Sequence, residues 1–293
     1  MSGNFKNKAV RDLAWALNSN AMLLGTHVVD QDVLDEEYLK YLPQLLKLDK
    51  NPSTLIDYLA KNNTRRLGHY FEQLVFFWLN QSERYTITAK NLPVRTEKKE
   101  TLGEIDVIVY DRELNIYEHW ELAVKFYLAH HSTEKTTFIG PNANDYFHLK
   151  LEKLIHRQCK IFETKAGQKI LNEYNINGLP SKLFVKGCMY YHPKQKYAAN
   201  EPLHPDHNQS WWIHVNEANT FLSDEDQYAL IHKNEWLSTP SLQDRLMSKK
   251  ECLDLIHKLL SESPRSLQLA RYKNRNLIDQ GFVTKDNWPN LIL

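Results

Sequence analysis

Hydrophobic and polar residues alternate with a period of two near the middle of the chain. In GEIDVIVY, residues 103–110, three β-branched residues lie on one face of a predicted strand, and Glu104, Asp106 and Ile108 lie on the other. IYEHWELAVKFYL, residues 116–128, is rich in aromatic and β-branched residues and predicts a second strand. The intervening DRELN contains turn-forming residues, so the pattern predicts an antiparallel hairpin.

This hairpin would bring acidic side chains together. If the chain folds back at the middle of DRELN, Asp106 lies directly opposite Glu121, with the Cβ atoms about 5 Å apart. A register shifted by two residues would place Ala123 opposite Asp106 instead. Two carboxylates at that distance repel unless they share a proton or bind a divalent cation such as Mg²⁺. Lys125, on the face of Glu121, could stabilise an attacking hydroxide or a phosphorane-like oxygen.

Helical patterns precede the hairpin. Apolar residues recur at helical spacing in residues 9–24, 35–49 and 51–62, and residues 64–80 predict a helix that enters the core. Glu72 lies on this last helix. It is either a solvated acid paired with Arg65 or His69, or a third acid directed at the carboxylates of the hairpin.

A second long helix is predicted over residues 145–171. One of its faces is basic and includes Lys150, Lys153 and Arg157, followed by Gln158. Such a face suits the phosphates of a nucleic-acid backbone, although a solvated charged face is an equal alternative.

Further strands and helices complete the pattern. Residues 85–97, 181–191 and 211–215 predict strands, and residues 221–237, 248–262 and 263–281 predict a helical C-terminal lobe. A loop with His192, His204 and His207 allows a zinc interpretation, but an ordinary loop is the commoner outcome of this spacing.

GEID, followed on the next strand by a carboxylate and a lysine, resembles the PD-(D/E)XK nuclease superfamily, also called restriction-endonuclease-like. The resemblance implies a central sheet flanked by helices in the order αβββαβ, with Asp106 as a metal ligand. Its second carboxylate and lysine are usually spaced E-x-K, whereas this chain reads Ala123-Val124-Lys125 and has its acid at Glu121. The resemblance also implies a role for a glutamate on the first helix, matched by Glu72.

Some superfamily members use a glutamine on the later helix, which Gln158 matches. VRDLAWAL at residues 10–17 and LGHYFEQLVFFWL at residues 67–79 additionally resemble an uncharacterised bacterial family, a domain of unknown function.

Composition limits the classes of protein to which the chain can belong. The 293 residues are 42% hydrophobic with only 9 Gly, which indicates a compact globular protein. The net charge of +1 means that a nucleic-acid footprint must be a local patch. Three widely spaced cysteines and the lack of an apolar leader favour a reducing cytoplasm, and no apolar run is long enough to span a membrane.

Together these patterns predict an α/β protein with a helical segment at residues 1–63, a restriction-endonuclease-like core at 64–215 and a helical lobe at 216–293. The leading functional hypothesis is a Mg²⁺- or Mn²⁺-dependent nucleic-acid phosphodiesterase, with DNA as the first partner to test. Asp106 and Glu121 would be metal ligands, Lys125 would activate water, and Glu72 would be a further acid. The alternatives are a non-catalytic module that binds nucleic acid or a protein, and a structural protein in which the carboxylates pair with Lys125.

Overall fold

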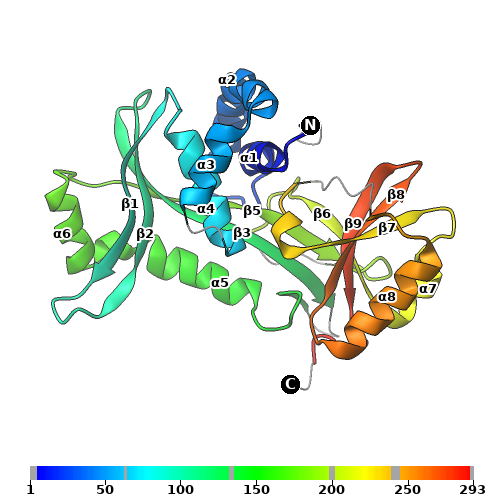
Figure 1. Cartoon of the computed structure of the whole chain (residues 1–293). Helices are drawn as coiled ribbons and strands as arrows, with labels where there is room; N and C mark the ends of the chain where they lie inside the picture. The colour runs from blue at the N-terminus through cyan, green and yellow to red at the C-terminus, as the bar shows by residue number, and fades with distance from the viewer. Residues whose placement is uncertain (1–4, 63–64, 132–134, 198–201, 239–244, 291–293) are drawn as a thin grey trace. The chain divides into compact units, whose positions relative to one another are not determined.

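The computed structural model describes residues 5–62, 65–131, 135–197, 202–238 and 245–290. The α-helices are α1 (Lys8–Asn18), α2 (Gln31–Lys50), α3 (Ser53–Lys61), α4 (Leu67–Leu79), α5 (Phe147–Lys153), α6 (Lys165–Glu173), α7 (Ala218–Phe221) and α8 (Lys249–Glu262) (Figure 1). The strands are β1 (Tyr85–Arg95), β2 (Thr101–Asp111), β3 (Ile116–His131), β4 (Thr136–Ile139), β5 (Ser181–Tyr191), β6 (Gln209–His214), β7 (Gln227–Ile231), β8 (Leu267–Lys273) and β9 (Asn276–Thr284). Short π- or 3₁₀-helical turns are η2 (Leu154–Gln158), η3 (Ile161–Glu163), η4 (Val215–Glu217) and η5 (Lys233–Glu235).

The strands form a nine-stranded mixed sheet in the order β1-β2-β3-β5-β6-β9-β8-β7, with β4 paired to β3. This confirms the predicted α/β class. The chain divides into two compact units. Unit 1 comprises Met1–Lys125, Lys150–Lys186 and His204–Asp206, and unit 2 comprises Phe126–Leu149, Gly187–Leu203 and His207–Leu293. Neither unit coincides with a segment predicted from the sequence, and those predicted boundaries stay a prediction.

The hairpin of β2 and β3 in unit 1 has the predicted register. Its antiparallel pairs run from Val107 with Trp120 to Asp111 with Ile116, around a four-residue turn. The turn ends at Asn115, whose φ of 57° is the left-handed conformation that asparagine tolerates better than most residues. Local turn chemistry and strand alternation therefore set this pairing.

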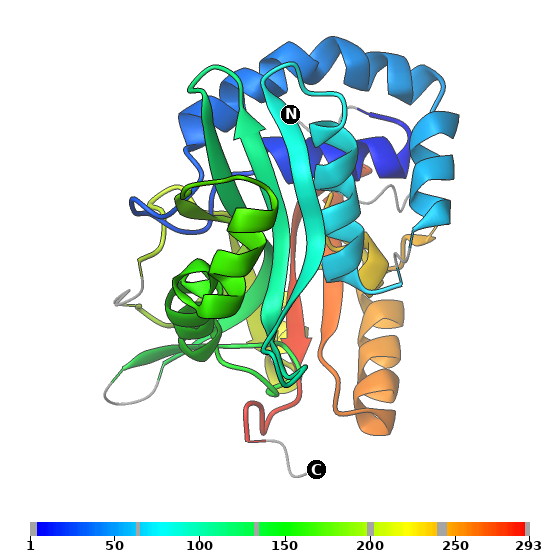
Figure 2. The same ribbon diagram turned by 90° about the vertical axis from the view of Figure 1, so that its left-hand side faces the viewer.

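Helical segments cover both faces of these strands. Successive residues of a strand point to opposite faces. On β3, the Trp120 ring stacks on Trp78 of α4 with the centroids 6.3 Å apart, while the neighbouring His119 ring meets Phe162 of η3 at 5.2 Å. Figure 2 shows α4 and the α5–α6 region on opposite sides of the strands. Side chains of β2 and β3 on the η3 side thus lie beneath the segment that follows α5.

The continuous helix predicted over residues 145–171 is wrong. The chain instead forms α5, the π-helical turn η2, the 3₁₀ turn η3 and α6. The amide of Cys159 donates to the carbonyl of Leu154, five residues back, at 2.9 Å. A Cβ on Gly167 would lie 2.2 Å from the Ile161 carbonyl oxygen, so the chain turns too closely there for a straight helix.

Two of the three helices predicted near the C-terminus are also wrong. Residues 221–237 contain β7, and residues 263–281 form most of the β8–β9 hairpin, whereas α8 occurs as predicted. The hairpin turns at Asn274 and Arg275, both left-handed with φ of 50° and 64°. The alternation of apolar and polar residues did not predict these strands because both faces of the sheet are covered in unit 2. There α8 packs against Leu269 and its neighbours.

Candidate functional site

Asp106 and Glu121 form a carboxylate pair where β2 and β3 separate. The ladder between the two strands ends at Val107 and Trp120, one position before the two acids. Beyond that point β2 continues only with β1. The Oδ2 atom of Asp106 accepts the amide N–H of Leu122 at 2.8 Å, so a side chain replaces the backbone bond that a continued ladder would make. The predicted juxtaposition of the two acids is therefore present.

The environment of the pair favours its protonated form. Burial, with the charges of Glu72 and Glu104, raises the pKa of Asp106 to about 7, despite the opposing Leu122 hydrogen bond. Burial, with the charge and hydrogen bond of Asp106, raises the pKa of Glu121 to about 9. Because two ionised carboxylates have no proton to donate to each other, this hydrogen bond requires a shared proton. A divalent cation could take that proton's place.

Glu72 and Lys125 act electrostatically on the pair from α4 and β3. The negative charge of Glu72 raises the pKa of both acids, and the positive charge of Lys125 lowers that of Glu121. Glu72 also lies 3.2 Å from Nδ1 of His69, as one sequence interpretation expects, and its role as a third acid stays a prediction. Ala123 is buried, and Glu121 is the acid beside Asp106.

The π-helical turn η2 brings a fifth predicted residue to the site. Gln158, its last residue, donates a hydrogen bond from Nε2 to Oε1 of Glu121. Such turns inside helical segments are frequent at functional sites. Lys150, Lys153 and Arg157 are exposed instead, so they present charge to solvent while Gln158 supports a carboxylate. Their roles in nucleic-acid binding stay predictions.

Sequence interpretation missed His119. Its side chain is fully buried on the face of β3 that carries Glu121, and burial lowers its pKa to about 4, so the ring is neutral. Nδ1 lies 3.0 Å from Oγ of Ser181, and Nε2 lies 3.7 Å from Oε2 of Glu121. Neither Nε2 nor Oε2 has a hydrogen-bond partner among the described residues. His119 and Glu121 are two residues apart on a predicted strand and therefore share a face. This spacing was the sequence signal that could have identified the histidine.

The side chains at the carboxylate pair can be compared with the ligands that a metal ion requires. Across the described ranges, no group of three or more His, Cys, Asp or Glu side chains is placed to hold one. Mg²⁺, however, commonly takes one or two carboxylates and completes its shell with water and substrate phosphate. A close acid pair whose buried Oε2 lacks a partner fits that requirement. The zinc interpretation gains no support: His192 contacts Glu217 at 2.7 Å and His207 contacts Tyr191 at 2.7 Å.

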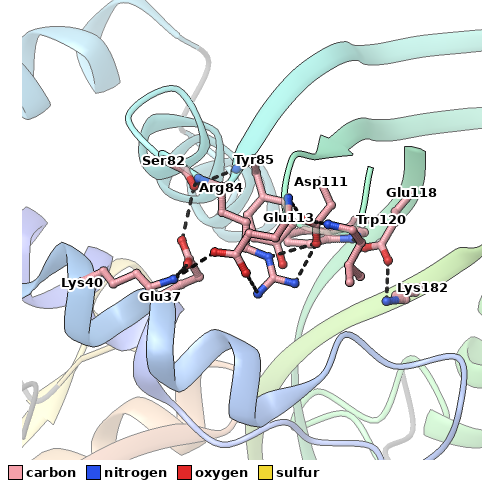
Figure 3. Close-up of polar contacts among 11 residues, drawn as sticks. Glu37, Lys40, Ser82, Arg84, Tyr85, Asp111, Glu113, Glu118, Trp120 and Lys182 are labelled. Carbon is pink, nitrogen blue, oxygen red and sulfur yellow. Dashed lines mark hydrogen bonds and ion pairs between the residues drawn. The ribbon is translucent and has the colours of Figure 1, made fainter. Parts of the chain in front are cut away.

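A polar network anchors the turn that sets the hairpin register (Figure 3). Arg84 donates from Nε and Nη2 to Oδ2 of Asp111, at 3.0 and 2.8 Å, and its Nη1 lies 3.0 Å from Glu113. Oδ1 of Asp111 accepts the turn amides of Glu113 and Leu114. Lys40 of α2 bonds Glu113 at 3.2 Å, which ties the helix to the turn.

Figure 3 also shows the polar contacts of Trp120, the residue that precedes Glu121. Its indole Nε1 donates to Oε2 of Glu118 at 2.8 Å, and Lys182 of β5 lies 2.5 Å from Oε1 of the same carboxylate. These contacts hold the Trp120 side chain on the α4 face and so hold Glu121 on the opposite face.

The raised pKa values predict a pH-dependent effect of Glu121→Gln on stability without metal. Between about pH 4.5 and 9 the folded wild type binds more protons at this pair than the unfolded chain does, so its stability falls as the pH rises. The glutamine does not titrate. We expect the variant to match wild type near pH 4.5 and to be more stable by on the order of 3 kcal/mol at pH 9. Urea unfolding with a chelator measures the difference, and a constant offset across this range would contradict the raised pKa.

A model of a family described as a domain of unknown function matches residues 11–283. No curated protein matches the chain, and no solved structure matches it.

Among the described helices, none combines the length and apolar character needed to cross a membrane. Cys159, Cys188 and Cys252 are free thiols.

Proposed function

We propose that this chain, which belongs to the DUF1853 family of domains of unknown function, is a Mg²⁺- or Mn²⁺-dependent phosphodiesterase that acts on nucleic acid, with DNA as the first substrate to test. The observation that carries the proposal is the carboxylate pair of Asp106 and Glu121. Glu121 is buried, Asp106 is half-buried, and the pKa of each acid is raised. The pair lies where two strands separate, with Glu72, Lys125 and Gln158 acting on it from three different segments.

The order of elements supports a restriction-endonuclease-like core in the proposal. From α4 to β5 the chain runs through one helix, three strands, an interrupted helical segment and one strand, with the short β4 added. This is the αβββαβ order that the resemblance implies. The acid on the first helix and the glutamine on the later helical segment both act on the carboxylate pair.

In the proposed reaction, each residue has a distinct task. Asp106 and Glu121 would hold the cation, which polarises a phosphoryl oxygen and lowers the pKa of an attacking water. The Leu122 amide fixes one oxygen of Asp106, and Gln158 fixes Oε1 of Glu121. Lys125, whose positive charge acts on Glu121, would stabilise the negative charge that develops on the phosphate. Lys150, Lys153 and Arg157 supply exposed cations that would bind the nucleic-acid backbone.

A non-catalytic function in nucleic-acid binding is the second candidate, favoured by Ala123 at the position where the resemblance expects an acid. Such a protein would keep the exposed cations and lose metal-dependent cleavage.

Calorimetric titration of the chelator-treated protein with Mg²⁺ and Mn²⁺ tests the proposal. The same protein is then incubated with single-stranded and duplex DNA and RNA, with and without the cation. We expect metal binding near pH 8 and cleavage that a chelator stops. Without metal binding or cleavage the proposal fails. Salt-dependent DNA binding that weakens when Lys150, Lys153 and Arg157 become alanine, without cleavage, would establish the binding function.

A further inference from the structure

We infer that His119 is a positioning residue for Glu121, and that its imidazole Nε2 holds Oε2 of that carboxylate in the orientation that receives the cation. The inference rests on the proposed function, because it assigns a task at the same metal site. Nothing in the PD-(D/E)XK pattern of acids and lysine points to this histidine.

The two atoms concerned are buried, and in the described part of the chain neither has a hydrogen-bond partner. Nε2 of His119 lies 3.7 Å from Oε2 of Glu121, and the two side chains are 0% and 3% exposed. Oε1 of Glu121 is already bonded to Gln158. A buried polar atom left without a partner is destabilising, so a small closing movement that joins this pair is favourable.

Ser181 allows the ring to hold Glu121 in both of its ionisation states. A hydroxyl can donate or accept a hydrogen bond, and Oγ of Ser181 lies 3.0 Å from Nδ1 of the ring. When both acids are protonated, the Asp106 O–H can donate to Glu121 while the Glu121 O–H donates to Nε2, and Nδ1–H then donates to Ser181. When a cation displaces the Glu121 proton, Ser181 donates to Nδ1 and Nε2–H donates to Oε2. The ring remains neutral in both arrangements.

Neighbouring contacts keep the ring in this place. Phe162 of η3 meets the His119 ring edge to face, with the centroids 5.2 Å apart, and the His119 amide donates to the carbonyl of Pro180 at 2.9 Å. The histidine is therefore held by β3, by η3 and by the residues at the start of β5. Partners that orient metal-binding side chains typically contribute 10- to 100-fold to metal affinity.

The test compares His119→Phe with His119→Gln by calorimetric titration with Mn²⁺, and records the urea-unfolding midpoint of each variant without metal. Phenylalanine fills the space and cannot hydrogen bond, whereas the glutamine amide can donate to Oε2. We expect His119→Phe to bind Mn²⁺ about 10- to 100-fold more weakly and His119→Gln to recover most of that loss. Ring ¹⁵N NMR of the wild type with diamagnetic Mg²⁺ should show the proton move from Nδ1 to Nε2.

Each outcome separates this inference from the proposed function. If wild type and both variants bind Mn²⁺ equally, His119 has no positioning task, while the metal site stands. If both variants lose affinity equally and in proportion to their unfolding midpoints, the histidine is only a packing residue and the inference is wrong. If the wild type binds no metal, the proposed function and this inference fail together.

Discussion

Asp106→Asn is expected to lower metal-dependent cleavage by at least about 100-fold, because loss of a mere supporting partner at a metal site already costs 10- to 100-fold. Asparagine has the same shape, and its Oδ1 can still accept the Leu122 amide that Asp106 binds at 2.8 Å. What it removes is the negative charge that would bind the cation. The variant should therefore stay folded and lose Mn²⁺ binding together with activity.

Glu104→Gln is the matched control for this variant. Glu104 lies two residues earlier on β2, is exposed, and affects Asp106 only through its charge. Removing that charge lowers the pKa of Asp106 slightly, so cleavage should remain within a few-fold of wild type. Cleavage by Asp106→Asn at the rate of Glu104→Gln would show that Asp106 holds no catalytic cation.

Arg84→Ala is expected to destabilise the protein by about 3 to 5 kcal/mol, the range observed when one partner of a buried ion pair is removed. The Arg84 side chain is 7% exposed and that of Asp111 is 1% exposed, so deletion of the guanidinium leaves a buried carboxylate without its charge partner. Burial favours the neutral acid, whereas the Arg84 hydrogen bonds and charge lower the pKa of Asp111. Urea unfolding at neutral pH measures the loss.

Glu113→Gln is the matched control, because Glu113 is half exposed and pairs with Lys40 in the same network at 3.2 Å. Exposed ion pairs contribute less than about 1 kcal/mol, so this variant should unfold close to wild type. Equal destabilisation by the two variants would show that the buried Arg84–Asp111 pair is not what stabilises the turn.

Because Asp111 also binds the turn amides, we expect Arg84→Ala to weaken Mn²⁺ binding by loosening the register that sets Asp106 opposite Glu121.

Local sequence patterns predicted the hairpin that carries the carboxylate pair. A hairpin pairs residues close in sequence, so its register depends on a short turn and on the alternation of a few side chains. The juxtaposition of Asp106 and Glu121 followed from these signals. The β8–β9 hairpin was missed because its strands are covered on both faces and so lack a clear alternation.

The sequence by itself therefore determined the β2–β3 hairpin, its turn and the adjacent acids, because each depends on neighbouring residues. Only the tertiary structure decided what surrounds the acids. Gln158 reaches Glu121 through a π-helical turn 37 residues away, and Ser181 meets His119 across 62 residues. The raised pKa values of Asp106 and Glu121 arise first from burial, which is set by packing of the whole unit and not by any local pattern.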